Sequence, residues 1–312
     1  TAPISGEPEI RGRRPEVKGR KSGAERSNDG KREAGVLTIN GAFRKGTGML
    51  KNAGNEAPAN DAGVLLCHAL KRGRTFLYSH GADELDGKLL ERYAALLEER
   101  AGGVPLQYIT GFQEFMSLPF KVCGDVLIPR QDTEILVEAV IKLCREKYAG
   151  RAGILDIGTG SGCIAVSLAY YMPETAVTAA DLMPEALAAA MENARLNGVA
   201  DRITFIKSNL FDEIEDGKFH FIVSNPPYIR SEDIAKLPKE IRCHEPAAAL
   251  DGGPDGLDFY RAILAEAPAF LKEEGMLCFE TGYDQAAEVA ALMKESFGNI
   301  RIIRDLAGIE RV

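Results

Sequence analysis

The stretch Ile154-Leu-Asp-Ile-Gly-Thr-Gly-Ser-Gly-Cys-Ile-Ala-Val-Ser-Leu-Ala-Tyr-Tyr171 decides the fold. Its first four residues, Ile154–Ile157, are mostly apolar and predict a short buried strand, and Ile164–Tyr171 predicts a helix. The turn between them holds three glycines, Gly158, Gly160 and Gly162. A strand that turns directly into a helix begins a βαβ unit, so the stretch predicts an α/β protein with a mostly parallel sheet covered on both faces.

Strand and helix patterns alternate through the rest of the C-terminal part. Helices are predicted over 184–197 and about 284–297, because Pro184 suits a first turn and Gly198 suits a helix end. Further strands are predicted at 176–180, 202–206, 219–223 and 275–279, with a closing pair at 301–304 and 309–312. With Ile154–Ile157 these make a seven-stranded, mostly parallel sheet.

The N-terminal part differs in composition and in its predicted secondary structure. Residues 1–36 are rich in Gly, Arg, Lys and Glu, and we expect a disordered basic tail because so few apolar groups cannot offset the entropy of ordering. Residues 37–104 predict a small helical domain, with Asp61 as a helix N-cap. Residues 105–128 predict a β-hairpin linker, and residues 129–312 form the α/β domain.

The composition of the chain argues against several kinds of binding partner. The net charge of the 312-residue chain is −8, and 45% of the residues are hydrophobic, which is typical of a globular protein. Nine basic and six acidic residues lie within 1–35, so the remainder carries −11 and is a poor match for stable nucleic-acid binding. The six cysteines and four histidines lack metal-ligand spacing, so no metal is expected. No apolar run is long enough to cross a membrane, and no secretory signal begins the chain, so we expect no membrane partner and a cytoplasmic location.

The glycine turn has a ligand-binding interpretation and a purely structural one. Glycines let a ligand approach the backbone closely at a helix N-terminus, but any tight turn also needs them. A dinucleotide fingerprint places its third glycine at the position of Cys163, whereas here Gly162 comes one residue earlier. That spacing favours S-adenosylmethionine. Asp156, just before the turn, is placed to receive the ammonium group of the methionine portion.

Two further polar residues follow predicted strands. Asp181 lies 21 residues after Gly160, where an acid accepts hydrogen bonds from ribose hydroxyls, although a helix N-cap is the alternative. Asn209 follows the next strand and is placed to meet an adenine amino group, although Ser208-Asn209 is also an ordinary turn.

The sequence Asn225-Pro-Pro-Tyr228 ends the predicted strand at 219–223. Two prolines cannot continue a sheet ladder, because neither has an N–H to donate. The turn therefore lies at the carboxyl end of a strand, where open α/β sheets bind ligands. Asn225 offers one acceptor and two donors and Tyr228 a flat ring, which suits a site that grips a planar NH2 group. A proline-rich turn without a role is the alternative.

Taken together, Gly158-Thr-Gly-Ser-Gly162, Asp181 and Asn225-Pro-Pro-Tyr228 resemble class I, Rossmann-like methyltransferases that modify planar amino nitrogens. The chain is more specifically similar to the HemK/PrmC family, the release factor glutamine methyltransferases. The stretches that carry this likeness are Pro105–Gly111, Glu114-Phe115, Leu127–Arg130, Asp132–Glu134, Val223–Ile229, Glu245-Pro246 and Ala249–Leu257.

The resemblance implies methyl transfer from S-adenosylmethionine to the side-chain amide of the glutamine in the Gly-Gly-Gln motif of peptide chain release factors. It also implies an N-terminal helical domain joined by a hairpin to the methyltransferase domain at 129–312. We expect the helical domain at 37–104 to recognise the protein substrate, and a purely structural role is the alternative. The cofactor-binding residues would be Asp156, Gly158, Thr159, Gly160, Gly162, Asp181, Asn209 and Asn225. The catalytic residues would be Asn225, Pro226 and Tyr228, and Pro227 would join them in holding the substrate.

Two departures from the family pattern stand out. The family usually has Asp where Asn209 stands, and the amide oxygen of Asn209 still accepts one bond, so we expect weaker adenine contact without loss of activity. The family usually has Pro where Gln131 stands, which loosens that turn.

A mechanism follows from the chemistry of the amide. Its nitrogen is a poor nucleophile because the lone pair is delocalised into the carbonyl. If the Asn225 side-chain oxygen and the Pro226 carbonyl each accept one N–H, the nitrogen is oriented for attack. Alternative substrates are a glutamine of a ribosomal protein or an exocyclic amine of a nucleic acid, and a scaffold without catalysis is a further alternative.

Overall fold

The computed structural model describes residues 37–215 and 217–312. The predicted basic tail at 1–36 lies outside the described residues.

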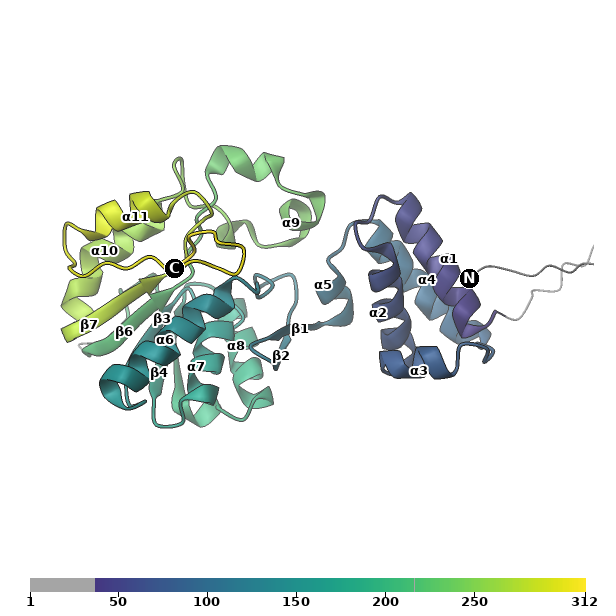
Figure 1. Cartoon of the computed structure of the whole chain (residues 1–312), viewed down its shortest axis with the longest axis horizontal. Helices are drawn as coiled ribbons and strands as arrows, with labels where there is room; N and C mark the ends of the chain where they lie inside the picture. The colour runs from purple at the N-terminus through teal and green to yellow at the C-terminus, as the bar shows by residue number, and fades with distance from the viewer. Residues whose placement is uncertain (1–36, 216) are drawn as a thin grey trace, which may run out of the picture. The chain divides into compact units, whose positions relative to one another are not determined.

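The described chain begins with five helices (Figure 1). They are α1 (Ile39–Asn52), α2 (Pro58–Leu70), α3 (Arg74–Ser79), α4 (Gly87–Ala101) and α5 (Leu106–Thr110). We call Ile39–Thr110 the helical region. Its core includes Leu50, Leu65, Leu66 and Leu97, which are all at least 96% buried. The leucines recur at three- and four-residue steps, so each helix turns one apolar face inward.

A β-hairpin follows the helical region. Strand β1 (Phe112–Phe115) pairs antiparallel with β2 (Leu118–Lys121). Buried Asn193 of α8 (Pro184–Leu196) holds the hairpin, because its Oδ1 accepts from Lys121 N at 2.7 Å and its Nδ2 donates to Lys121 O at 3.0 Å. The hairpin predicted within 105–128 is therefore present, preceded by the short helix α5, which the sequence patterns did not predict.

The C-terminal part is built on one parallel sheet (Figure 1). Its strands are β3 (Gly153–Ile157), β4 (Ala176–Asp181), β5 (Ile203–Lys207), β6 (Phe219–Ser224) and β7 (Leu271–Phe279). They lie in the order β5-β4-β3-β6-β7, and every pairing is parallel. Chain order reverses beside β3, which places a topological switch point between β3 and β6.

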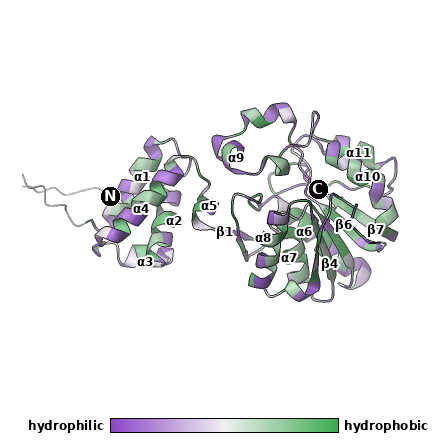
Figure 2. Ribbon diagram, turned by 180° about the vertical axis from the view of Figure 1, so that it is seen from behind, coloured by the Kyte–Doolittle hydropathy of each residue, from purple (hydrophilic) through white to green (hydrophobic). Residues whose placement is uncertain are grey.

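Both faces of this sheet are buried. Successive side chains along a strand point to opposite faces, so neighbouring residues pack into different clusters. Ile154 packs with α6 (Thr133–Tyr148), α7 (Cys163–Tyr171) and α8, whereas its neighbour Leu155 packs with α10 (Asp258–Phe270) and α11 (Ala286–Met293). Figure 2 shows the strands coloured largely as hydrophobic residues. Continuous apolar runs are expected for strands that are buried on both sides.

The prediction of seven strands is wrong: the sheet has five within the described residues. The segments 301–304 and 309–312 pair with each other as predicted, through the bridge Arg304↔Glu310 and backbone bonds between Ile303 and Val312 at 2.7 Å and 3.1 Å, but they are not strands of the sheet. The segment 309–312 is joined to the chain just after β7 by one backbone hydrogen bond, in which Thr281 N donates to Arg311 O at 2.8 Å. The only apolar run in the two segments is Ile302-Ile303, so neither segment offers the continuous apolar stretch of a strand buried on both faces.

Gly162 sets how closely α7 and α8 approach. Its φ is +79°, and a Cβ there would lie 2.9 Å from Ala190 Cβ and 3.0 Å from Ala190 Cα. A side chain would therefore force the two helices apart, so this glycine has a structural role whatever the loop binds.

We expect Gly162→Ala to destabilise the protein more than Gly198→Ala does. Gly198 has a similar φ of +69° but open space around it, so its substitution adds only backbone strain of about 1 kcal/mol. The clash at Gly162 should add about 1–3 kcal/mol. Urea denaturation of both variants measures the difference, and equal losses would show that helix packing at Gly162 is not limiting.

Candidate active site

The candidate residues meet at one edge of the sheet. Because β3, β4, β5 and β6 are parallel and in register, their carboxyl ends lie side by side. The glycine turn follows β3, Asp181 ends β4, Asn209 follows β5 and Asn225 follows β6. The turn and Asn225 therefore flank the switch point between β3 and β6, where ligands of open α/β sheets bind.

The glycine turn leaves space above its backbone. A Cβ at Gly158 or Gly160 would meet no described atom within 4 Å, and both have positive φ, at +72° and +55°. Gly162, in contrast, packs against Ala190. The three glycines thus divide into two that keep a surface open for a ligand and one that lets two helices pack.

Asp156 lies fully buried beneath this turn. Its Oδ2 accepts from Thr159 Oγ1 at 2.6 Å, while its Oδ1 has no partner among the described residues. Burial raises the pKa of Asp156 to about 7, against which the hydrogen bond from Thr159 acts. An unpartnered buried carboxylate oxygen beside an open surface is suited to a cationic ligand group.

Asp181 is held by backbone amides on both oxygens. Gly160 N donates to its Oδ2 at 2.8 Å and Met183 N to its Oδ1 at 2.9 Å. Asp181 is not the N-cap of α8, because Met183 has that position. A carboxylate oxygen accepts more than one bond, so Asp181 retains capacity for hydroxyl groups.

Apolar side chains adjoin this carboxylate. Leu182 is 53% exposed and Met183 46% exposed, and the sequence patterns did not single them out. Asn209 is also exposed, and its Nδ2 donates to Asp212 Oδ2 at 3.1 Å, which leaves its carbonyl oxygen available as an acceptor. A polar rim beside apolar side chains suits a flat ring that carries amino and hydroxyl groups.

The orientation of Asn225 depends on a residue from a distant part of the chain. Its Nδ2 donates to Oγ1 of Thr133, the buried first residue of α6, at 3.2 Å. Thr133 in turn hydrogen-bonds Glu280, a 1% exposed carboxyl whose pKa burial raises to about 7. Because the amide nitrogen is engaged, Oδ1 is the end of Asn225 that remains available to accept a hydrogen bond.

The turn at Pro227-Tyr228 is held by the backbone of Leu250–Gly256, called the clamp below. Ile229 N donates to Leu250 O at 3.0 Å, and Gly252 N donates to Ile229 O at 2.8 Å. A Cβ at Gly252 would lie 2.7 Å from Tyr228 Cα, and one at Gly256 would lie 2.4 Å from Tyr228 O. The stretch 249–257 therefore needs glycines because two backbones touch.

Several residues that the sequence reasoning did not assign complete this clamp. Gln285 is 2% exposed, and its Nε2 donates to Tyr228 O at 2.9 Å. Arg130 Nη2 contacts both oxygens of Glu245, at 2.5 Å and 2.7 Å, and so ties the segment before α6 to the segment before 249–257. Burial raises the pKa of Tyr228 to about 12, so the phenol stays neutral near neutral pH.

Two negative findings concern the described residues alone. Within 37–215 and 217–312 no group of three or more His, Cys, Asp or Glu side chains is arranged to hold a metal ion. Over the same ranges no helix is long and apolar enough to span a membrane.

The fold and the site define a methyltransferase. A family model described as "Methyltransferase small domain" matches residues 131–247, and one described as "PrmC N-terminal domain" matches residues 41–111. The second model covers most of the helical region.

Similar proteins narrow the class further. A release factor glutamine methyltransferase from Moorella thermoacetica is 42% identical over 279 residues, which cover 88% of this chain and 97% of the relative. Its counterpart from Geobacter sulfurreducens is also 42% identical, covering 89% and 96%. A solved release factor-specific protein-(glutamine-N5) methyltransferase from Alicyclobacillus acidocaldarius is 37% identical, covers 62% of this chain and 95% of its own, and has a TM-score of 0.39. The chain belongs to the release factor glutamine methyltransferase family.

The buried carboxyl of Asp156 should make stability depend on pH. Its pKa is raised from 3.8 to about 7, so the stability that its protonation provides is full below about pH 4 and is lost as pH rises through 7. We expect Asp156→Asn, which cannot ionise, to gain on the order of 3 kcal/mol relative to wild type between about pH 5 and about pH 8. Urea denaturation at both pH values measures this gain. Glu280 titrates in both proteins and cancels in the difference, and a difference that does not change with pH would contradict the assignment.

The close backbone contact at Gly252 should matter for activity as well as stability. We expect Gly252→Ala to displace Tyr228 and to lower methyltransferase turnover at least tenfold, with a stability loss of about 1–3 kcal/mol. Gly124→Ala is the matched control, because its Cβ would meet only His244 O at 3.9 Å. Unchanged turnover in a folded Gly252→Ala protein would show that the clamp does not position the turn.

Proposed function

We propose that the chain transfers a methyl group from S-adenosylmethionine to the side-chain amide nitrogen of the glutamine in the Gly-Gly-Gln motif of peptide chain release factors. The observation that carries this proposal is the place of Asn225-Pro-Pro-Tyr228. The turn lies across the switch point from the open glycine turn, with the carbonyl oxygen of Asn225 available. The printed names of the relatives support the choice of substrate.

The residues of the cofactor site fit S-adenosylmethionine. The unpartnered Oδ1 of buried Asp156 suits the ammonium group, and the open surface over Gly158 and Gly160 gives room for the methionine portion. Asp181 would accept from the ribose hydroxyls, while Asn209 would accept from the adenine amino group between exposed apolar neighbours. Bound S-adenosylmethionine supplies an electrophilic methyl group on a sulfonium sulfur.

The part played by the chain in catalysis is orientation and charge stabilisation. Asn225 Oδ1 and the Pro226 carbonyl would each accept one N–H of the substrate amide, which directs the remaining nitrogen lobe towards the methyl group. As the N–C bond forms and the C–S bond breaks, positive charge grows on nitrogen and both hydrogen bonds strengthen. The cofactor would supply the methyl group and keep the electron pair of its C–S bond, and the surplus proton on nitrogen would leave to solvent after transfer.

Two further side chains, those of Thr133 and Tyr228, would hold Asn225 and the substrate amide in the required orientation. Thr133 holds the amide nitrogen of Asn225, so the side chain cannot turn its donor end towards the substrate. Tyr228, which is partly buried and packed on the core below, would stack on the planar amide and exclude water.

Labelled methyl transfer separates the substrate classes. The chain is incubated with a purified release factor, with ribosomal proteins or with RNA, and mass spectrometry locates the added methyl. We expect a single methyl on the Gly-Gly-Gln glutamine, and methylation confined to ribosomal protein or RNA would overturn the proposal. A cytoplasmic location follows from the same substrate, because translation termination takes place there.

Asn225→Ala should lower turnover strongly while leaving cofactor binding largely intact, although Asn225 is also among the residues expected to touch the cofactor. Loss of the oriented acceptor removes transition-state stabilisation, so we expect kcat to fall on the order of 100-fold or more. Calorimetry should show an S-adenosylmethionine Kd within about twofold of wild type. Asn52→Ala, which removes an exposed amide at the end of α1, is the control. Near-normal turnover in Asn225→Ala would contradict the proposed mechanism.

A further inference from the structure

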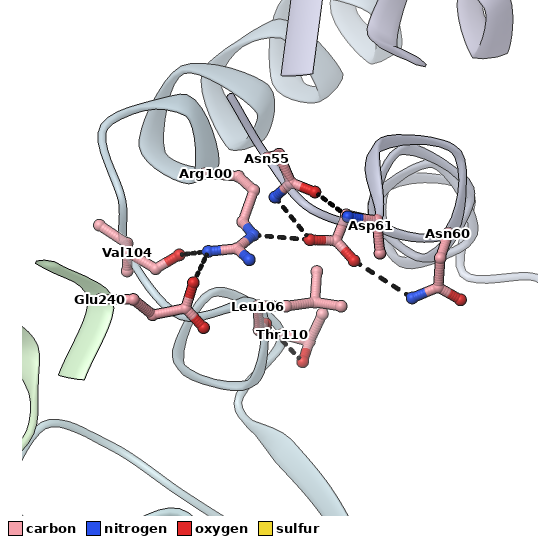
Figure 3. Close-up of polar contacts among 9 residues, drawn as sticks. Asn55, Asn60, Asp61, Arg100, Val104, Leu106, Thr110 and Glu240 are labelled. Carbon is pink, nitrogen blue, oxygen red and sulfur yellow. Dashed lines mark hydrogen bonds and ion pairs between the residues drawn. The ribbon is translucent and has the colours of Figure 1, made fainter. Parts of the chain in front are cut away.

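Arg100, in the last turn of α4, bonds three partners at once (Figure 3). Its Nε donates to Asp61 Oδ2 at 2.8 Å, and its Nη1 donates to Val104 O at 2.9 Å and to Glu240 Oε2 at 2.6 Å. The Arg100 side chain is only 11% exposed. Asp61 belongs to α2 and Glu240 to α9 (Lys239–His244), so one guanidinium joins two helices of the helical region to α9.

The contacts of Asp61 with Arg100 do not depend on Glu240. Asp61 was predicted as an N-cap, but α2 begins at Pro58 and Ala57 has the N-cap position. The Asp61 side chain is 6% exposed, and its carboxylate also accepts from Asn55 and Asn60, at 2.9 Å and 3.1 Å. Arg100 is thus anchored within the helical region, and Glu240, which is 40% exposed, is the partner that can be changed without leaving a buried charge unpaired.

A second bond joins α9 to the same turn. Lys239 Nζ donates to Gly102 O at 3.0 Å. Two adjacent residues of α9 therefore hold the end of α4, which fixes α9 more firmly than one ion pair would.

The far end of α9 is linked to the segment before Thr133, which holds Asn225 in the turn Asn225–Tyr228, called the catalytic turn below. Glu245, the residue after α9, has a side chain 1% exposed and binds Arg130. Arg130 stands three residues before Thr133, which holds Asn225. The segment 239–245 is therefore bound at one end to the helical region and at the other to Arg130, three residues before the partner of Asn225.

We propose that Arg100 and Glu240 are positioning residues that hold the helical region and the catalytic turn in the arrangement needed to receive a folded protein substrate at both places. This rests on the proposed function, because only a protein substrate is large enough to contact both. The ion pair touches none of the proposed cofactor-binding residues, so its loss should weaken substrate binding without affecting S-adenosylmethionine.

Glu240→Gln tests the proposal in the full-length protein. We expect KM for an intact release factor to rise about fivefold, with kcat within about twofold of wild type. Calorimetric Kd for S-adenosylmethionine and the thermal unfolding midpoint should not change. Glu232→Gln makes the same charge change at another exposed residue and should leave KM unaltered. Lys239→Met should act in the same direction as Glu240→Gln, and the double variant should have the larger effect.

The outcomes separate this inference from the proposed function. Wild type that fails to methylate release factor overturns the proposed function itself. Wild type that is active, with Glu240→Gln at the wild-type KM, overturns the positioning role. A Glu240→Gln protein whose unfolding midpoint and cofactor affinity fall together with its activity shows a merely structural ion pair and also overturns it.

Discussion

The contact between two backbones, at Pro227-Tyr228 and at Gly252–Gly256, is the constraint on which the proposed catalytic site depends. The two prolines remove the N–H groups that would have continued the β6 ladder, so the turn needs support from elsewhere. That support comes from bonds at Ile229 and from Gln285, which donates to Tyr228 O. Close approach is possible because neither glycine carries a side chain.

Around this contact, the proposed chemistry depends on which end of the Asn225 side-chain amide is free to meet a substrate. Thr133 accepts from Asn225 Nδ2, and buried Glu280 engages Thr133. Thr133 at the start of α6 and Glu280 just after β7 thus favour the orientation in which Asn225 presents its acceptor oxygen. The same reasoning relates the cofactor side to burial, because Asp156 keeps one unpartnered oxygen that a bound cation would satisfy.

Much of the fold was predictable from local pattern. Alternating strands and helices, the glycine turn after β3 and the hairpin at 112–121 all correspond to residues whose spacing acts over a few positions. The prediction of seven strands failed at 301–304 and 309–312, where two short segments of mixed polarity pair with each other and not with the sheet. The predicted N-cap at Asp61 failed because the carboxylate serves a tertiary partner, Arg100.

The sequence by itself determined the α/β architecture, the loop that follows β3 and the Asn225–Tyr228 turn, since glycine, proline and apolar periodicity constrain the backbone locally. Only the tertiary structure decided which partners orient these residues. Asn225 meets Thr133 across 92 residues of chain, Gln285 meets Tyr228 across 57, and Arg100 meets Glu240 across 140. Pairings over such separations depend on how the chain packs around both faces of the sheet, which no local pattern records.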